Sequence, residues 1–180
     1  MIQEVFKIIN IGVVTMKELI IKKLNDRGVK LEAISAVVYK LQKPYSENLT
    51  VEECQEALEH VLEKREVQYT LLTGITLDEL TERGELEEPL SEIIKEDEPL
   101  YGVDESLAFA ISSIYGTIGF TSFGYLDKHK MGIMKELDTS ENSVNTFLDD
   151  LVAGLASAAS AKIAHQKRTE LNIKEELEEE

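Results

Sequence analysis

The chain has 180 residues and a formal net charge of −16, which suits one domain with a sizeable core and argues against nucleic-acid binding, because phosphate backbones would be repelled. Three prolines, 6% aromatic residues and runs rich in Ala, Leu, Glu and Lys, without period-2 alternation, predict an all-α protein. The single cysteine, Cys54, excludes an internal disulfide. With no uninterrupted apolar stretch of transmembrane length, these features predict a cytoplasmic protein without a membrane span.

The first part of the chain predicts short amphipathic helices. Residues 1–14 are expected to form a leader or a short helix. Thr15 is placed to cap the next helix, and Gly28 is placed to end it. A second helix is expected over residues 31–42, because its apolar side chains recur at helical spacing and Pro44 follows.

Two capping signatures organise the following stretch. Residues 50–53 form a capping box that opens a long helix, which we expect to end at Gly74. Residues 76–79 repeat the signature and predict a short helix that ends at Gly84. Another short helix is expected over residues 89–95, since proline is favoured at a helix start.

A turn-rich break over residues 96–103 is the expected boundary between an N-terminal helical layer, residues 15–95, and the part that carries the chemistry, residues 100–166. A helix is expected over residues 104–115. The glycine-rich stretch 116–125 indicates close helix packing or an irregular turn, and less often a backbone nest for phosphate.

Residues 145–166 are the expected central helix of the fold. Nearly every residue from Phe147 to Ile163 is apolar or small, which is typical of a helix buried on all sides. We therefore predict a compact multi-helix bundle around an Ala/Gly-rich rod, with residues 15–168 as a single domain. The charge run over residues 169–180 is expected to be an acidic tail, as a solvated helix or without structure.

Acidic side chains in apolar surroundings are the candidate ligands of an ion. They occur in three places: Asp104–Glu105, Asp127 and Asp149–Asp150. A buried carboxylate is costly unless a cation or hydrogen-bond donors satisfy it, so three such places can converge on one ion. For the last pair there is an alternative, because a cap at Asn145 or Thr146 would put both aspartates in a first helical turn, where negative charge is favourable without any ligand.

Other candidate sites are less specific. Residues 127–130, Asp-Lys-His-Lys, form a compact basic cluster, which is either a surface turn or a source of cations for phosphate. The acidic spacing of Glu53, Glu56 and Glu59 fits a solvated helix face better than the metal face of a helical nucleotide pyrophosphatase. The histidines lack zinc-ligand spacing, and the common phosphate-loop, dinucleotide and serine-hydrolase motifs are absent.

Three short motifs resemble one family, phosphatidylglycerophosphatase A. The segment from Asp149 to Gly154 resembles its D-D-x-x-A-G helix, Asp104–Glu105 its D-E pair, and Asp127-x-x-Lys130 its D-x-x-K segment, in the same order. The match is closest over residues 100–163, and the first hundred residues resemble the helical extension of the soluble, Bacillus-type branch. Two departures are the missing G-T-x-G-S segment of the membrane-embedded members and Met131, where the family has proline.

The resemblance implies Mg²⁺-dependent removal of the terminal phosphate from phosphatidylglycerophosphate, with Mn²⁺ as a substitute. The expected metal ligands are Asp104, Glu105, Asp149 and Asp150, which offer the hard oxygens that Mg²⁺ prefers. Asp127 and Lys130 are the expected catalytic residues, and Lys128 and Arg65 are expected helpers in binding phosphate.

The expected partners are a phosphate ester, including a phospholipid headgroup met during transient contact with a membrane surface, and further copies of the chain in a homo-oligomer. The main alternative is a non-catalytic helical binding module on the same scaffold. A weaker alternative is a nucleotide pyrophosphatase that uses the Glu53 and Glu56 face.

Overall fold

The structure is a computed structural model that describes residues 14–140 and 143–178, so most of the expected leader lies outside the described residues. The described chain is helical and contains no strand, which confirms the all-α prediction. The α-helices are α2 (Met16–Asp26), α3 (Leu31–Gln42), α4 (Val51–Val61), α5 (Arg65–Glu82), α6 (Leu90–Lys95), α7 (Val103–Ser112), α8 (Thr117–His129), α9 (Ile133–Asp138) and α10 (Leu148–Glu178). Two 3-10 turns, η1 (Lys43–Tyr45) and η2 (Ser113–Tyr115), follow α3 and α7.

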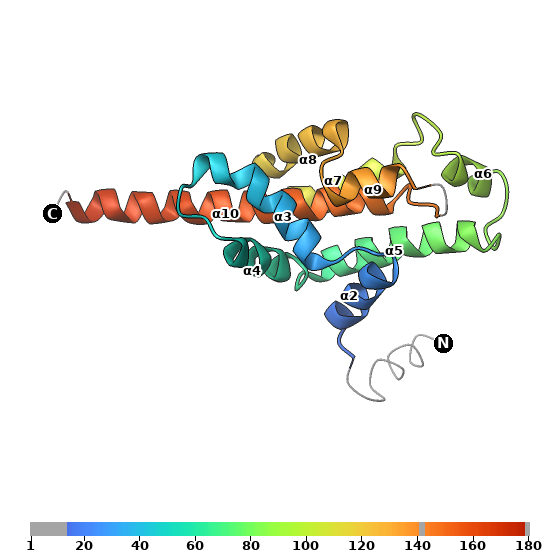
Figure 1. Cartoon of the computed structure of the whole chain (residues 1–180), viewed down its shortest axis with the longest axis horizontal. Helices are drawn as coiled ribbons and strands as arrows, with labels where there is room; N and C mark the ends of the chain where they lie inside the picture. The colour runs from blue at the N-terminus through green and yellow to red at the C-terminus, as the bar shows by residue number, and fades with distance from the viewer. Residues whose placement is uncertain (1–13, 141–142, 179–180) are drawn as a thin grey trace.

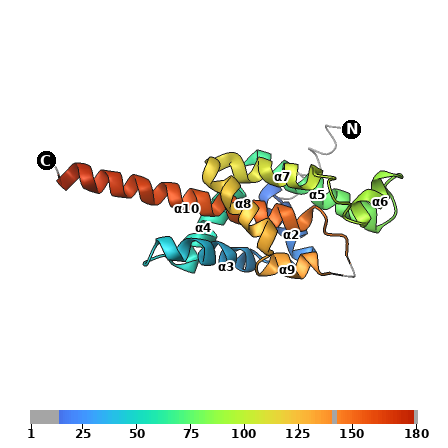
Figure 2. The same cartoon turned by 90° about the horizontal axis from the view of Figure 1, so that it is seen from above.

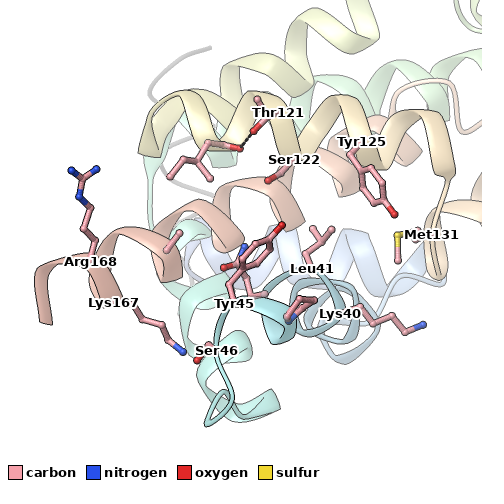
Figure 3. Close-up of a pocket in the computed structure, with 14 residues that line it drawn as sticks. Lys40, Leu41, Tyr45, Ser46, Thr121, Ser122, Tyr125, Met131, Lys167 and Arg168 are labelled. Carbon is pink, nitrogen blue, oxygen red and sulfur yellow. Dashed lines mark hydrogen bonds between the residues drawn. The ribbon is translucent and has the colours of Figure 1, made fainter. Parts of the chain in front are cut away.

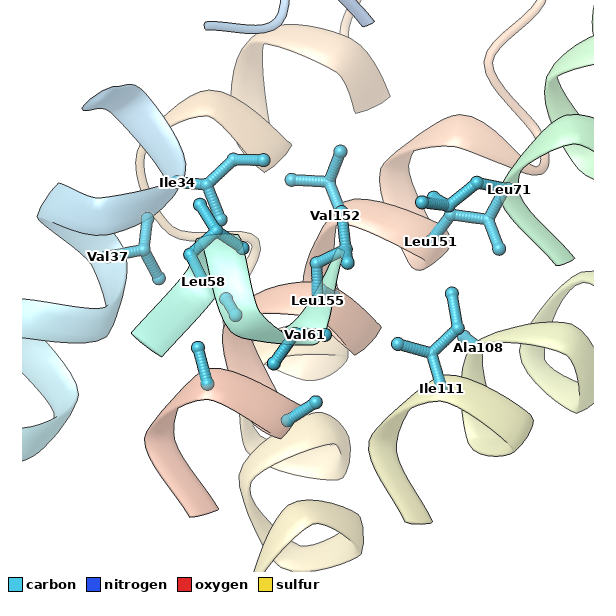
Figure 4. Close-up of a cluster of buried hydrophobic side chains, with 14 of the residues drawn as sticks. Ile34, Val37, Leu58, Val61, Leu71, Ala108, Ile111, Leu151, Val152 and Leu155 are labelled. Atoms are coloured by element: carbon cyan, nitrogen blue, oxygen red, sulfur yellow. The ribbon is translucent and has the colours of Figure 1, made fainter. Parts of the chain in front are cut away.

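Helix α10 is the rod around which the other helices pack (Figure 1, Figure 2). Its apolar residues, from Phe147 just before its start to Ile163, are buried, as predicted. Leu151, Val152 and Leu155 lie between side chains of α3 and α4 on one side and of α5 and α7 on the other (Figure 4). Because small side chains dominate this helix, the neighbouring helices can pack against it closely on several faces.

Local sequence signals fix the first helices. The side chain of Thr15 accepts a hydrogen bond from the backbone of Glu18 at 3.2 Å, and Glu18 accepts one in return at 2.6 Å, which forms a capping box. Gly28, with φ +80°, turns the chain after α2 as expected. Cys54 is fully buried in the core of the described protein.

The prediction of one long helix from residue 51 to Gly74 is wrong. Helix α4 ends at Val61 and α5 begins at Arg65, and at the break the amide of Gln68 donates to the Leu62 carbonyl at 2.7 Å. Gly74 lies inside α5, where a Cβ atom would stand 2.6 Å from Leu151 Cδ1. This glycine therefore permits the crossing of α5 and α10 and does not end a helix.

The second predicted capping signature, residues 76–79, is also wrong as a helix start, because it lies in the continuous helix α5. Helix α5 ends at Glu82, and Gly84, with φ +64°, follows as the predicted terminator. The short helix after Pro89 forms over Leu90–Lys95 as predicted. A local pattern of polar residues thus indicated a cap where tertiary packing continues the helix.

The glycine-rich stretch forms α8 and packs closely against the end of α7. A Cβ atom on Gly119 would lie 1.9 Å from the carbonyl oxygen of Ser112, so no larger residue fits there without movement of the backbone. Gly116, with φ +83°, makes the turn between η2 and α8. Close packing and a turn, the two main predictions for this stretch, are both found. Within the described residues, no helix combines the length and the apolarity needed to cross a membrane.

Candidate metal and phosphate site

Three helix ends bring the predicted acidic side chains together. Asp104 and Glu105 lie in the first turn of α7, Asp127 near the end of α8, and Asp149 and Asp150 in the first turn of α10. The close approach of α7 to α10 depends on a glycine of the D-D-x-x-A-G motif: a Cβ atom on Gly154 would lie 2.9 Å from the carbonyl oxygen of Ala108. The motif thus positions the two acidic helix starts side by side.

Carboxylates from α7 and α10 form a group suited to a divalent cation. One oxygen each of Asp104, Glu105 and Asp150 lie within 4.8 Å of one another. Asp104 Oδ1 and Glu105 Oε2 are buried and have no hydrogen-bond partner in the described part of the chain. Buried oxygens of this kind are costly unless they are satisfied, and hard cations such as Mg²⁺ bind carboxylate oxygens. The residues present therefore fit a metal ion.

Burial and neighbouring negative charges raise the pKa values of carboxyl groups in this cluster. Burial, and next the neighbouring carboxyl of Glu105, with which a proton can be shared, together raise the pKa of Asp104 to about 7. Burial also raises the pKa of Asp150 to about 8, with the charge of Asp149 as the next contribution. A cation and a proton are thus alternative ways to offset the same negative charges.

Lys130 joins the α8 and α10 carboxylates. Its Nζ lies 2.7 Å from Asp149 Oδ2, 3.2 Å from Asp150 Oδ1 and 3.1 Å from Asp127 Oδ1. The lysine ends α8 in a left-handed conformation with φ +40°. Burial alone would lower the pKa of Lys130, but the charges of Asp149 and Asp150 raise it well above its ordinary value, so the ammonium stays charged.

The two adjacent aspartates of α10 play different parts in this geometry. Asp150 belongs to the group with Asp104 and Glu105, while Asp149 directs one oxygen to Lys130 and the other to the backbone N–H of Asp150, at 2.8 Å. Neighbouring positions on a helix point about 100° apart, which explains the division. Asp149 remains a predicted ligand, and the geometry places it beside the lysine.

The start of α10 is capped by a residue that the sequence analysis did not identify. Asp78 of α5 accepts hydrogen bonds from the backbone N–H groups of Phe147, at 3.2 Å, and Leu148, at 3.0 Å. Burial raises its pKa to about 8, although the two N–H groups and Arg27 act in the opposite direction. The only sequence signal was its place in a predicted capping signature, which assigned it to the wrong helix.

The predicted caps of α10 bind elsewhere. The side chain of Asn145 donates to the carbonyl of Leu137 at 3.0 Å, and the hydroxyl of Thr146 donates to the carbonyl of Ile94. Asp149 and Asp150 do lie in the first turn, as the alternative interpretation required, but their exposed fractions are only 7% and 4%. Solvent therefore does not satisfy them, and the carboxylates depend on Lys130, on the backbone N–H of Asp150 and on any bound cation.

A small hollow of about 220 Å³ opens beside Asp149. Asp97 and Asp138 also line it, and sequence reasoning missed both, because Asp97 falls in the turn taken as a boundary and Asp138 in a polar link. Asp97 has a left-handed backbone with φ +48°, and burial raises its pKa. An anion entering this acidic hollow would be repelled unless cations offset the charge.

The two expected phosphate helpers do not join the group. Lys128 is exposed on α8, and no described contact connects it to the carboxylates. Arg65 begins α5, about 20 Å along the helix axis from Asp78. The alternative acidic face does not gather either: Glu53 belongs to the capping box of α4, and Glu59 pairs with Lys17 at 3.7 Å.

The comparisons with known proteins agree with the three motifs. A model of the family described as phosphatidylglycerophosphatase A matches residues 20–165. The chain is 53% identical over 142 residues to an uncharacterized protein, YpjQ, of Bacillus subtilis, an alignment that covers 79% of this chain and 80% of that protein.

Two solved structures are similar over most of their length. A protein of unknown function from Bacillus stearothermophilus is 50% identical, with a TM-score of 0.82, over 86% of this chain and 96% of its own. The low temperature requirement C protein from Listeria monocytogenes is 45% identical, with a TM-score of 0.84, over 87% of this chain and 99% of its own. With its three motifs inside the matched range, the chain belongs to the phosphatidylglycerophosphatase A family.

Proposed function

We propose that the protein hydrolyses a phosphate monoester with a divalent cation, Mg²⁺ or in its place Mn²⁺. The observation that carries the proposal is the group formed by Asp104, Glu105 and Asp150, in which two buried oxygens have no partner among the described residues. A purely structural acidic cluster would be expected to satisfy those oxygens with donors. Family membership supports phosphate chemistry for the chain.

In this proposal Asp104, Glu105 and Asp150 hold the cation, whose chemistry is to neutralise phosphoryl oxygens and the charge that develops on them. Lys130 supplies a second positive charge next to the group, at 3.2 Å from Asp150. Asp149 holds the lysine in place through its 2.7 Å ion pair, which makes Asp149 a positioning residue.

Asp127 is the proposed base that orients the attacking water. Among the three carboxylates around Lys130, its side chain is the most exposed, at 40%, against 10% for Asp149 and 5% for Asp150. A base has to reach both the water and its proton, so the accessible carboxylate is the best placed of the three. Asp127 Oδ1 also lies 3.1 Å from Lys130 Nζ, so the proposed base and the charge of the lysine lie side by side.

The proposed substrate is phosphatidylglycerophosphate, which would yield phosphatidylglycerol. Support comes from the family to which the chain belongs. The small volume beside Asp149 suits a phosphate with a short polar group, so the lipid part of such a substrate would stay outside it. The acidic lining also accounts for the need for a cation, because the substrate phosphate is itself an anion.

Phosphate release tests this proposal. Phosphatidylglycerophosphate in mixed micelles, a simple aryl phosphate and a nucleoside triphosphate are incubated with the protein, with Mg²⁺ or with a chelator. We expect release from the lipid only with Mg²⁺, and a loss of about a hundredfold or more in Asp150→Asn and Lys130→Gln. Lys128→Gln, in the same helix turn but exposed, is the matched control and should retain activity. Release that is unchanged by the chelator, or no release from any phosphomonoester, would refute the proposal.

A further inference from the structure

A second, larger hollow, which none of the carboxylates lines, lies between the end of α3 with η1 and the outer face of α8 (Figure 3). Its volume is about 810 Å³, and it shares no residue with the candidate metal site. The apolar side chains of Leu41, Ile118 and Met131 line it, together with the rings of Tyr45 and Tyr125. This size and lining are typical of pockets that bind small organic molecules.

The charges along this groove are opposite to those of the protein as a whole. The chain carries 35 acidic and 19 basic residues, yet the charged residues that line the groove are Lys40, Lys167 and Arg168, all basic. Lys167 and Arg168 project from α10 at one end, while Tyr125 and Met131 lie at the other (Figure 3). Lys40, the third cation, lies toward Met131 (Figure 3). An elongated apolar floor with two of its three cations at one end matches an anionic head and a hydrocarbon body.

The aromatic side chains at this groove are left in contact with water. Tyr45 is 83% exposed and Tyr125 is 47% exposed. Exposed apolar rings beside a concave surface are typical of ligand-binding sites, because covering them removes apolar area from water. The groove therefore offers a ligand both exposed apolar area and positive charge.

We propose that this groove binds an amphiphilic organic anion, with a single alkyl chain on the apolar floor and a carboxylate or phosphate head at Lys167 and Arg168. Lys167 lies about 17 residues beyond Asp150, hence about 26 Å along α10. The head is thus too far from the carboxylates to be the group that the metal site acts on. The ligand is separate from the substrate, and this site does not depend on the proposed hydrolase activity.

Isothermal titration calorimetry below the micelle concentration tests the site with dodecyl phosphate, dodecanoate, dodecyltrimethylammonium and inorganic phosphate, in chelator so that the proposed hydrolase cannot act on the alkyl phosphate. We expect both alkyl anions to bind about tenfold or more tightly than the alkylammonium or inorganic phosphate. Comparison of the two alkyl anions shows which head the site prefers. Equal affinity for the alkylammonium, tight binding of inorganic phosphate alone, or no binding of either alkyl anion would overturn the proposal.

Variants locate the binding. Arg168→Gln should weaken binding of the alkyl anions severalfold, and the double change with Lys167→Gln by about tenfold or more. The single change is included because Lys167 also borders a neighbouring hollow lined by Glu53. Tyr45→Ser removes a highly exposed ring, so the fold should be retained while affinity falls. Lys135→Gln on α9 is the matched control. Unchanged binding in the double variant refutes this location.

Discussion

The variant Asp150→Asn distinguishes a metal site from an acidic cluster that binds no ion. Oxygens of Asp104, Glu105 and Asp150 lie within 4.8 Å of one another. At that separation and an effective dielectric constant of about 20, two ionised carboxylates repel each other by roughly 3 kcal/mol. Above pH 8, where Asp150 is ionised, and without a divalent cation, the Asn variant removes this repulsion and loses one contact to Lys130. We therefore expect it to be as stable as the wild type or more stable in chelator.

In Mg²⁺, by contrast, the wild type should be more stable than Asp150→Asn. At a concentration of about 100 times Kd, a ligand that binds only the folded state stabilises it by about 2.7 kcal/mol. For a protein of this length, that corresponds to a rise of about 5 to 10 °C in Tm. The wild type should show this rise, and Asp150→Asn should show a small fraction of it. Thermal unfolding, followed by circular dichroism in chelator and in Mg²⁺, gives both values for each protein.

Asp26→Asn on α2 is the control for a general effect of lost negative charge. Asp26 is a carboxylate on the surface that pairs with Lys22, and it lies outside the acidic group. The control variant should respond to Mg²⁺ as the wild type does. Equal rises in Tm for the wild type and for Asp150→Asn would refute the assignment of the cation to this group. Asp149→Asn should retain part of the rise, because Asp149 faces Lys130.

Four further substitutions test the packing and the buried charges. Gly119→Ala should lower the free energy of unfolding by about 3 kcal/mol, because its Cβ atom would overlap a backbone carbonyl. Gly124→Ala has open space around it and should raise the free energy of unfolding by about 0.5 to 1 kcal/mol. Lys130→Met should lower it by about 3 kcal/mol, since carboxylates would lose their buried cation. In the wild type, burial raises the pKa of Asp78 from 3.8 to about 8, so its contribution to stability is greatest below pH 4 and is lost as the pH rises to about 8. Asp78→Asn should remove this part of the pH dependence, at most about 1.4 kcal/mol per pH unit.

Urea unfolding at several pH values measures each of these changes. Equal destabilisation by Gly119→Ala and Gly124→Ala would show that α7 and α8 do not pack as described. A Lys130→Met protein with wild-type stability would mean that its partners are solvated. An Asp78→Asn profile parallel to that of the wild type would mean that the carboxyl of Asp78 titrates at its ordinary pKa when folded.

Much of the fold was predictable because its signals are local. The small apolar residues of α10, the capping boxes at Thr15 and Thr50, and Gly28 each specify structure through neighbours a few residues away. Gly74 was misread because the reason for this glycine is Leu151 on another helix. A glycine at a helix crossing and a glycine at a helix end look alike in a sequence.

The candidate site was predictable to the extent that its motifs are short and acidic. Sequence reasoning could assign Asp149 and Asp150 together, but only the rotation of α10 distinguishes the one facing Lys130 from the one facing α7. Asp78 caps a helix about 70 residues further along the chain, and Asp97 reaches the hollow beside Asp149 from a turn. Such long-range contacts leave no spacing that a sequence can reveal.

The most direct test of the metal site is an anomalous difference map from crystals of the protein grown with Mn²⁺, collected on both sides of the manganese absorption edge. The metal assignment predicts one strong peak between the carboxylates of Asp104, Glu105 and Asp150, and no such peak in Asp150→Asn crystals. Ordered carboxylates with no peak between them, at a Mn²⁺ concentration that supports phosphate release, would contradict it.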